Sequence, residues 1–124
     1  MIARGYPQLV VRSAGEVVGW CDVTPKSGPI DARIGVLGMG LLPQFRHQGI
    51  GSRLMARALA AARAFGFSRV ELTVYRSNEN AIRLYEKAGF LIKAVQPAQA
   101  PGDDIDRTTL IMALSLDAPA SGQR

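Results

Sequence analysis

The residues best suited to chemistry lie in a short loop with two glycines. Residues 44–52 read Gln-Phe-Arg-His-Gln-Gly-Ile-Gly-Ser and follow an apolar segment that ends at Pro43. A helix beginning here would direct unpaired backbone N–H groups and the positive end of its dipole at the loop, which favours an anion. Gly49 and Gly51 allow close approach of the backbone, and Arg46 offers a fork of donors to phosphate oxygens. The pattern therefore predicts a loop that holds a phosphate or pyrophosphate.

Other glycine motifs fit this loop less well. A P-loop requires lysine after its last glycine, whereas Ser52 and Arg53 follow Gly51. A dinucleotide-binding fingerprint requires a third glycine, and Leu54 stands at that position. A plain turn between a strand and a helix remains the alternative, because short glycine motifs also occur by chance.

Three further side chains have types that can take part in catalysis. Tyr85 lies on the inward stripe of a predicted helix, where its hydroxyl could protonate a leaving group or simply fill the core. The single cysteine, Cys21, has no disulfide partner in the chain, and a small buried apolar role is favoured over a nucleophile. His47 is the only histidine and lacks partner ligands, so no metal is expected.

The spacing of apolar residues predicts the elements that position this loop. Apolar residues recur at helical spacing over Ile50–Phe65, with Gly66 as the stop. A second helix is expected to begin after Ser77 or Asn78 and to end at Gly89. Residue types and turn signals predict six strands, at Gln8–Arg12, Glu16–Val23, Ile34–Leu42, Val70–Tyr75, Phe90–Val95 and Thr108–Leu116. Helical crossovers make strands parallel and hairpins make them antiparallel, so a mixed α/β sheet is expected.

Length and composition exclude several classes of protein. The chain has 124 residues, 48% of them hydrophobic and 20% charged, which fits one domain with its own core and excludes disorder. We expect residues 1–117 to form this domain and residues 118–124 to be a flexible tail. No apolar run is long enough for a membrane span or a signal peptide, so a cytoplasmic protein is expected. The net charge of +5 favours an anionic partner, but 6% aromatic residues without a basic–aromatic stretch argue against nucleic acid.

Two motifs in the expected order resemble those of the GNAT superfamily of N-acetyltransferases. Arg-x-x-Gly-x-Gly at 46–51 resembles the acetyl-CoA signature, and Asn-x-x-Ala-x-x-Leu-Tyr-x-x-x-Gly-Phe at 78–90 resembles the family's later motif. The resemblance covers about Leu9–Leu116. It implies a mixed, mostly antiparallel sheet with a splayed parallel pair and flanking helices. The family's usual first strand and N-terminal helices, which build one wall of the acceptor pocket, are expected to be lacking.

The resemblance also implies a reaction and a set of site residues. A primary amine of a small molecule or peptide would attack acetyl-CoA directly, with Tyr85 as general acid for the thiolate. The backbone of Met39 and Leu41 would contact the acetyl carbonyl and the pantetheine arm, and Asn78 would also contact the pantetheine. The pyrophosphate would be held by the loop residues Arg46, His47, Gln48, Gly49, Ile50, Gly51 and Ser52.

The general base is not assigned by the sequence. Thr73 stands where related bacterial enzymes often carry a glutamate, and Glu71 and Asp22 are candidates with surface ion pairs as the alternative. Without the acceptor wall, a coenzyme A-binding module with little turnover is the competing hypothesis. The first predicted strand would then be an exposed edge, which suggests a possible homodimer.

Overall fold

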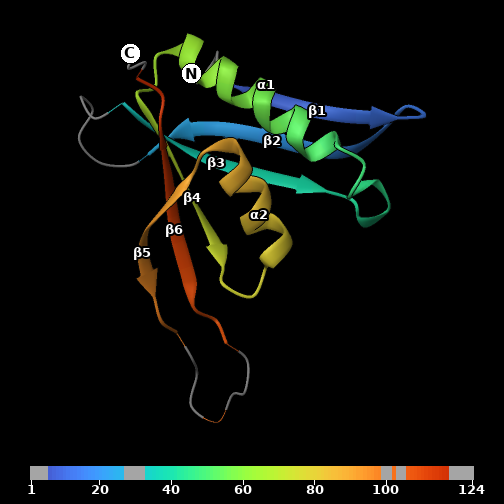
Figure 1. Ribbon diagram of the computed structural model, residues 1–124. Coiled ribbons are helices and arrows are strands. Elements are labelled where there is room, and N and C mark those ends of the chain that lie inside the picture. Colours follow the sequence, from blue (N-terminus) through green and yellow to red (C-terminus); the bar gives the residue numbers. More distant parts are fainter. Residues whose placement is uncertain (1–5, 27–32, 99–101, 103–105, 118–124) are drawn as a thin grey trace.

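The structure is a twisted sheet with two helices, given by a computed structural model that describes residues 6–26, 33–98, 102 and 106–117 (Figure 1). In that part of the chain the strands follow the order β1-β2-β3-β4-β6-β5. The strands are β1 Gln8–Ser13, β2 Glu16–Pro25, β3 Ile34–Leu41, β4 Arg69–Tyr75, β5 Leu91–Gln96 and β6 Thr109–Ser115. The helices are α1 Ile50–Phe65 and α2 Glu79–Ala88, and a 3-10 turn, η2, covers Pro43–Phe45. The tail predicted at 118–124 lies outside the described residues.

Strand pairing confirms the mixed, mostly antiparallel sheet. Strands β3 and β4 form the parallel pair, and the other neighbours are antiparallel. The crossovers through α1 and α2 both run in the same direction across the sheet, and right-handed crossovers then put both helices on one face. Figure 1 shows α1 and α2 together on the near side of the sheet. The flanking helices therefore cover one face, and no described helix covers the other.

The parallel pair is splayed, as predicted. Strands β3 and β4 are in register only from Ile34 opposite Arg69 to Val36 opposite Glu71. Beyond that point β3 continues along β2, whereas β4 continues along β6. In Figure 1 the two strands diverge from their shared end, β3 toward the right and β4 downward. Beyond the shared end, β3 stays hydrogen-bonded to β2 and β4 stays hydrogen-bonded to β6. A gap therefore opens between β3 and β4 while both halves of the sheet remain paired.

The core lies between the sheet and the two helices. Helix α1 buries one stripe, formed by Leu54, Met55, Ala58 and Ala62. It packs on buried strand residues that include Cys21, Val23, Leu72 and Met112. Both helices end at a glycine with positive φ, Gly66 at 114° and Gly89 at 108°. At the second of these ends Phe90 N–H donates to the Tyr85 carbonyl over 3.0 Å, which is the predicted Schellman-type end.

Strand β2 is longer than predicted, because it continues past Val23 to Pro25. Proline usually ends a strand since it has no N–H to donate. Here Pro25 lies opposite Gly35, and the next residue, Lys26, donates its N–H to the Ile34 carbonyl over 2.9 Å. Alternate residues of an antiparallel strand bond to the same neighbour, so Pro25 occupies a position where β3 needs no donor.

Candidate active site

The backbone of Met39 and Leu41 faces the gap between β3 and β4. Lys26 N–H donates to Ile34 at one end of the β2–β3 pair, and Leu42 N–H donates to Val18 at the other end, both over 2.9 Å. The register between these ends has no irregularity, so the even-numbered β3 residues bond to β2 and the odd-numbered ones point away from it. Strand β4 has already diverged there. The N–H and C=O groups of Met39 thus meet no strand on that side and are open to a ligand.

The loop between β3 and α1 presents a run of free backbone donors. The first amide of the helical ladder is that of Arg53, which donates to Gly49 over 3.2 Å. Among the residues that the structure describes, none accepts a hydrogen bond from the amides of 47–52. The Arg46 amide differs, because it donates to Pro43 over 3.1 Å. The free run therefore begins one residue later than the sequence suggests, at His47.

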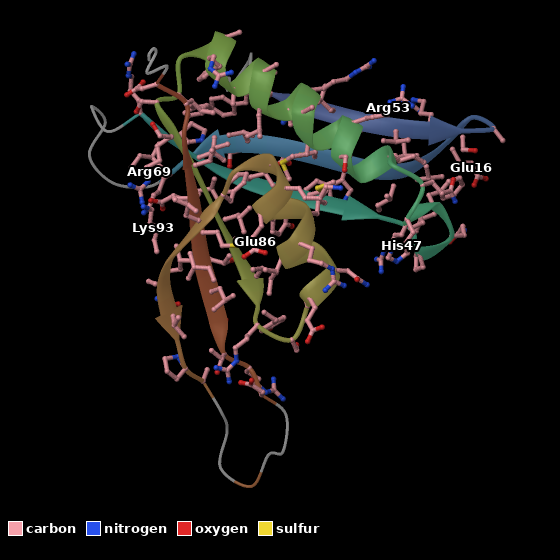
Figure 2. All side chains as sticks on the ribbon, viewed as in Figure 1. Glu16, His47, Arg53, Arg69, Glu86 and Lys93 are labelled. Atoms are coloured by element: carbon pink, nitrogen blue, oxygen red, sulfur yellow. The ribbon has the colours of Figure 1, made fainter. Side chains whose placement is uncertain are left out.

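Left-handed residues shape this run into a concave turn. His47 has a φ of 63° and Gly49, the N-cap of α1, has a φ of 81°. Alternation between left-handed and right-handed residues makes successive N–H groups converge, an arrangement that binds anions. Figure 2 shows His47 in this loop beyond the end of β3. We refer to the backbone of 47–52 as the amide nest.

Two side chains of the loop donate to nearby backbone carbonyls. Arg46 Nε donates to the Leu41 carbonyl over 2.9 Å, and Gln48 Nε2 donates to the Gln44 carbonyl over 2.8 Å. The Arg46 guanidinium is therefore anchored at the end of β3 beside the gap. A Cβ atom at Gly51 would lie 3.5 Å from Leu84 Cδ2 and 3.6 Å from Met39 Cε, so the nest, the gap and α2 meet at this glycine.

Tyr85 reaches the same region from α2. It is partly buried against the core and makes an edge contact with Phe90, with ring centroids 6.0 Å apart. Burial raises the pKa of Tyr85 above its usual range, and the charge of an ionised Cys21 would raise it further. Tyr85 packs against the core cluster that contains Cys21, and Cys21 lies opposite Met39 in the sheet. A phenol that keeps its proton in such a place can act as an acid.

Asn78 caps α2, so the helix begins after this residue and not after Ser77. Its Oδ1 accepts the N–H of Ala81 over 3.3 Å. The side-chain oxygen is thus used within the chain, and the amide nitrogen is the part of Asn78 left to meet a ligand.

Cys21 is a buried apolar residue in this structure. Its exposed fraction is 0%, and burial, followed by the nearby charge of Asp22, raises its pKa to about 12. A thiol with this pKa has almost no thiolate near neutral pH. The geometry agrees with the reading of Cys21 as a packing residue.

We expect Cys21→Ala to keep catalytic turnover within about twofold of the original rate, because a thiol that stays protonated is a poor nucleophile. The variant should lose about 1 kcal/mol of unfolding free energy through the small cavity. Steady-state rates and urea denaturation measure the two effects. An acetylated intact protein in mass spectrometry, absent from the variant, would contradict this prediction.

Glu71 forms ion pairs at the closed end of the splayed pair. Its Oε1 lies 2.6 Å from Lys26 Nζ and its Oε2 lies 3.0 Å from Arg69 Nε, and its side chain is 12% exposed. The hydrogen bond from Lys26 is the main cause that lowers the pKa of Glu71. Figure 2 shows Arg69 at this end of the sheet, far along it from His47. A carboxylate so paired is a structural group, which favours the ion-pair alternative over a base.

We expect Glu71→Gln to leave turnover unchanged and to lower the unfolding free energy by about 1 kcal/mol near neutral pH. A lowered pKa in the folded state stabilises the fold above the unfolded pKa and loses this effect as pH falls through the folded value. The stability difference from the original protein should therefore vanish in acid. Urea denaturation near pH 7 and near pH 3 measures it, and a large loss of turnover in the variant would restore Glu71 as a candidate base.

Arg53 and Arg57 lie on the side of α1 that faces β1. The two arginines border a groove of about 250 Å³, which is also lined by Leu9, Val11 and Leu54. A larger groove of about 560 Å³ runs between α1 and α2, and Ser52 of the nest is part of its wall.

Within the described ranges, no three His, Cys, Asp or Glu residues gather as a metal site would require. No helix in those ranges is long and apolar enough to cross a bilayer.

The sequence analysis missed one arrangement. It lies on the face of the sheet that no described helix covers, which we call the bare face. Trp20 of β2 lies across Gly38 and Gly40 of β3, where a Cβ atom would come within 3.1 Å and 2.7 Å of its indole ring. The signal was present as glycine at alternate positions of a strand, which often marks close approach by another group. Only the register of β2 on β3 identifies that group as Trp20.

Known proteins share this fold. The YncA structure from Salmonella typhimurium, solved with its cofactor acetyl-CoA, superposes with a TM-score of 0.81 at 25% identity and covers 96% of this chain and 69% of that chain. The fold is thus that of acetyltransferases. The family model described as Acetyltransferase (GNAT) family matches residues 3–90, and the chain belongs to this family.

Curated relatives are longer than this chain. Mycothiol acetyltransferase of Propionibacterium freudenreichii is 32% identical over 96 residues, which is 75% of this chain and 30% of the relative. The L-amino acid N-acetyltransferase AaaT of Escherichia coli is 30% identical over 90 residues, which is 72% of this chain and 56% of the relative. The chain thus spans between about a third and a half of the length of these proteins.

Proposed function

We propose that the protein transfers an acetyl group from acetyl-CoA to a primary amine of a small molecule or peptide. The observation that carries this proposal is the meeting of free donors at the mouth of the β3–β4 gap. The amide nest lies at one end of β3, and Met39 turns its own backbone groups into the gap just before it. A diphosphate joined to an extended amide-bearing arm fits both features.

Binding of the donor would use backbone groups along its whole length. The nest amides would donate hydrogen bonds to the pyrophosphate oxygens, helped by the dipole of α1 and by the Arg46 guanidinium. The Met39 C=O and the Leu41 N–H would pair with the pantetheine amides, and the Met39 N–H would polarise the acetyl carbonyl. The amide nitrogen of Asn78 would complete the contacts from α2. The net charge of +5 favours approach of this anionic donor.

The reaction would be a direct acyl transfer. The neutral amine attacks the thioester carbonyl carbon, a C–N bond forms, and the C–S bond breaks. The thiolate takes its proton from the Tyr85 hydroxyl, and the ammonium formed on the acceptor gives its extra proton to solvent. The raised pKa of Tyr85 supports this role, because the group stays protonated until the thiolate forms. The relatives support this reaction class, since AaaT is an L-amino acid N-acetyltransferase and YncA was solved with acetyl-CoA.

A thiol-release assay with acetyl-CoA and a panel of amines tests the proposal. We expect release above the rate of hydrolysis with at least one amine, together with an acetylated product in mass spectrometry. The competing hypothesis is a coenzyme A-binding module with little or no turnover. Saturable coenzyme A binding without acetylation of any amine would select that alternative, and no binding at all would exclude both.

A further inference from the structure

The bare face of the sheet carries a candidate site beside the gap, built from Trp20, Asp22 and two glycines. Buried Cys21 and Val23 point toward the helices, so the intervening residues of β2 point to the bare face. The Cβ positions of Gly38 and Gly40 lie close to atoms of both rings of Trp20. The indole therefore lies along the glycine strip, and its residue is 44% exposed.

Asp22 brings an unneutralised negative charge to this site. Its Oδ1 lies 3.3 Å from the Cβ position of Gly38, which is next to the edge of the Trp20 ring. Within the ranges that the structure describes, Asp22 takes part in none of the ion pairs, which join Glu71 to Lys26 and Arg69, and Asp106 to Arg76. Its carboxylate thus remains available to a cation from outside the chain.

The site is adjacent to the backbone that would hold the acetyl group. Trp20 lies opposite Gly40 and Asp22 lies opposite Gly38, so the two side chains flank Met39 along the strand. Met39 presents its N–H and C=O to the gap, whereas Trp20 and Asp22 occupy the sheet face beside it. Because Gly38 and Gly40 carry no side chains, Trp20 and Asp22 lie directly against the β3 backbone on either side of Met39.

We infer that this site binds a positively charged group of the acceptor, so that the preferred acceptor is an amine with a second cationic centre. An indole face attracts an ammonium through its quadrupole, and a carboxylate beside it supplies the counter-charge. The two features favour the same ligand and disfavour an anionic one. This inference rests on the proposed acetyl transfer, because it names the acceptor class of that same gap.

Acetylation of 1,5-diaminopentane and of pentylamine compares acceptors that differ in the second charge. After correction for the two equivalent amines of the diamine, we expect the kcat/KM for 1,5-diaminopentane to be about tenfold higher than that for pentylamine. Asp22→Asn should reduce this preference to about twofold or less, mainly through the KM of the diamine, with the KM for acetyl-CoA unchanged. Trp20→Leu should reduce it partly, and Asp22→Glu should retain most of it.

Glu16→Gln is the matched control, because Glu16 is an exposed residue at the far end of the same strand and the change removes the same charge. It should keep the full preference for the diamine. A wild-type preference near one, or a preference that survives in both Asp22→Asn and Trp20→Leu, would overturn the inference while acetyl transfer stands. Absence of transfer to either amine and to any other amine tried would overturn the proposed function itself. If Asp22→Asn fails to fold, the Trp20→Leu variant decides alone.

Discussion

Tyr85→Phe is expected to lower kcat about 100-fold and to leave the dissociation constant for acetyl-CoA within about twofold. The phenylalanine ring preserves the packing on Phe90 and the core, so the loss isolates the hydroxyl. Without it the thiolate must leave unprotonated or take its proton from water. A drop of this size corresponds to about 2.7 kcal/mol of transition-state stabilisation.

The pH dependence gives a second readout of the same residue. Burial raises the pKa of Tyr85, so the acid form persists at pH values where a solvated tyrosine would begin to ionise. The original protein should therefore keep its rate up to about pH 10, the usual pKa of the group. Tyr85→Phe should remove any fall in rate at higher pH.

Tyr6→Phe is the matched control for this experiment. Tyr6 packs edge-on against Phe65 at the far end of α1, with ring centroids 5.5 Å apart. The substitution removes the same hydroxyl group as Tyr85→Phe does. Its kcat should stay within about twofold of the original value. An equal loss of affinity and turnover in Tyr85→Phe would assign the hydroxyl a structural role instead.

Gly49→Ala is expected to weaken coenzyme A binding about tenfold or more. Gly49 has a φ of 81°, and an alanine there either strains by about 1–2 kcal/mol or shifts the backbone of the nest. A shift misaligns several charge-assisted hydrogen bonds at once, each worth about 1.5–3 kcal/mol. Calorimetric titration with coenzyme A measures the change, and urea denaturation measures the strain.

Gly66→Ala separates strain from binding, because it makes the same change at the opposite end of α1. Gly66 has a φ of 114°, and both positions are surrounded by open space, with no atom within 4 Å of an added Cβ. Both variants should lose about the same unfolding free energy, but only Gly49→Ala should lose affinity. Equal affinities in the two variants would mean that the nest does not hold the donor.

Much of the fold could be read from the sequence because its signals are local. The helical spacing from Ile50, the stops at Gly66 and Gly89 and the strand-forming run before Tyr75 each depend on neighbouring residues, and each is confirmed. The splayed pair came from the motif resemblance. The sequence analysis placed the end of β2 at Val23, two residues too early. The strand can include Pro25 because β3 needs no N–H donor at that position, and only the strand register shows this.

The sequence by itself determined which residues form the helices and the strands, where the glycine loop lies and which family the chain resembles. Only the tertiary structure decided which backbone groups are free, that Glu71 is paired with Lys26, and that Trp20 covers Gly38 and Gly40. The physical reason is that helix stops and strand propensities arise within a few residues. Free amides, ion pairs and close approaches depend on strand register, which joins residues far apart in the chain.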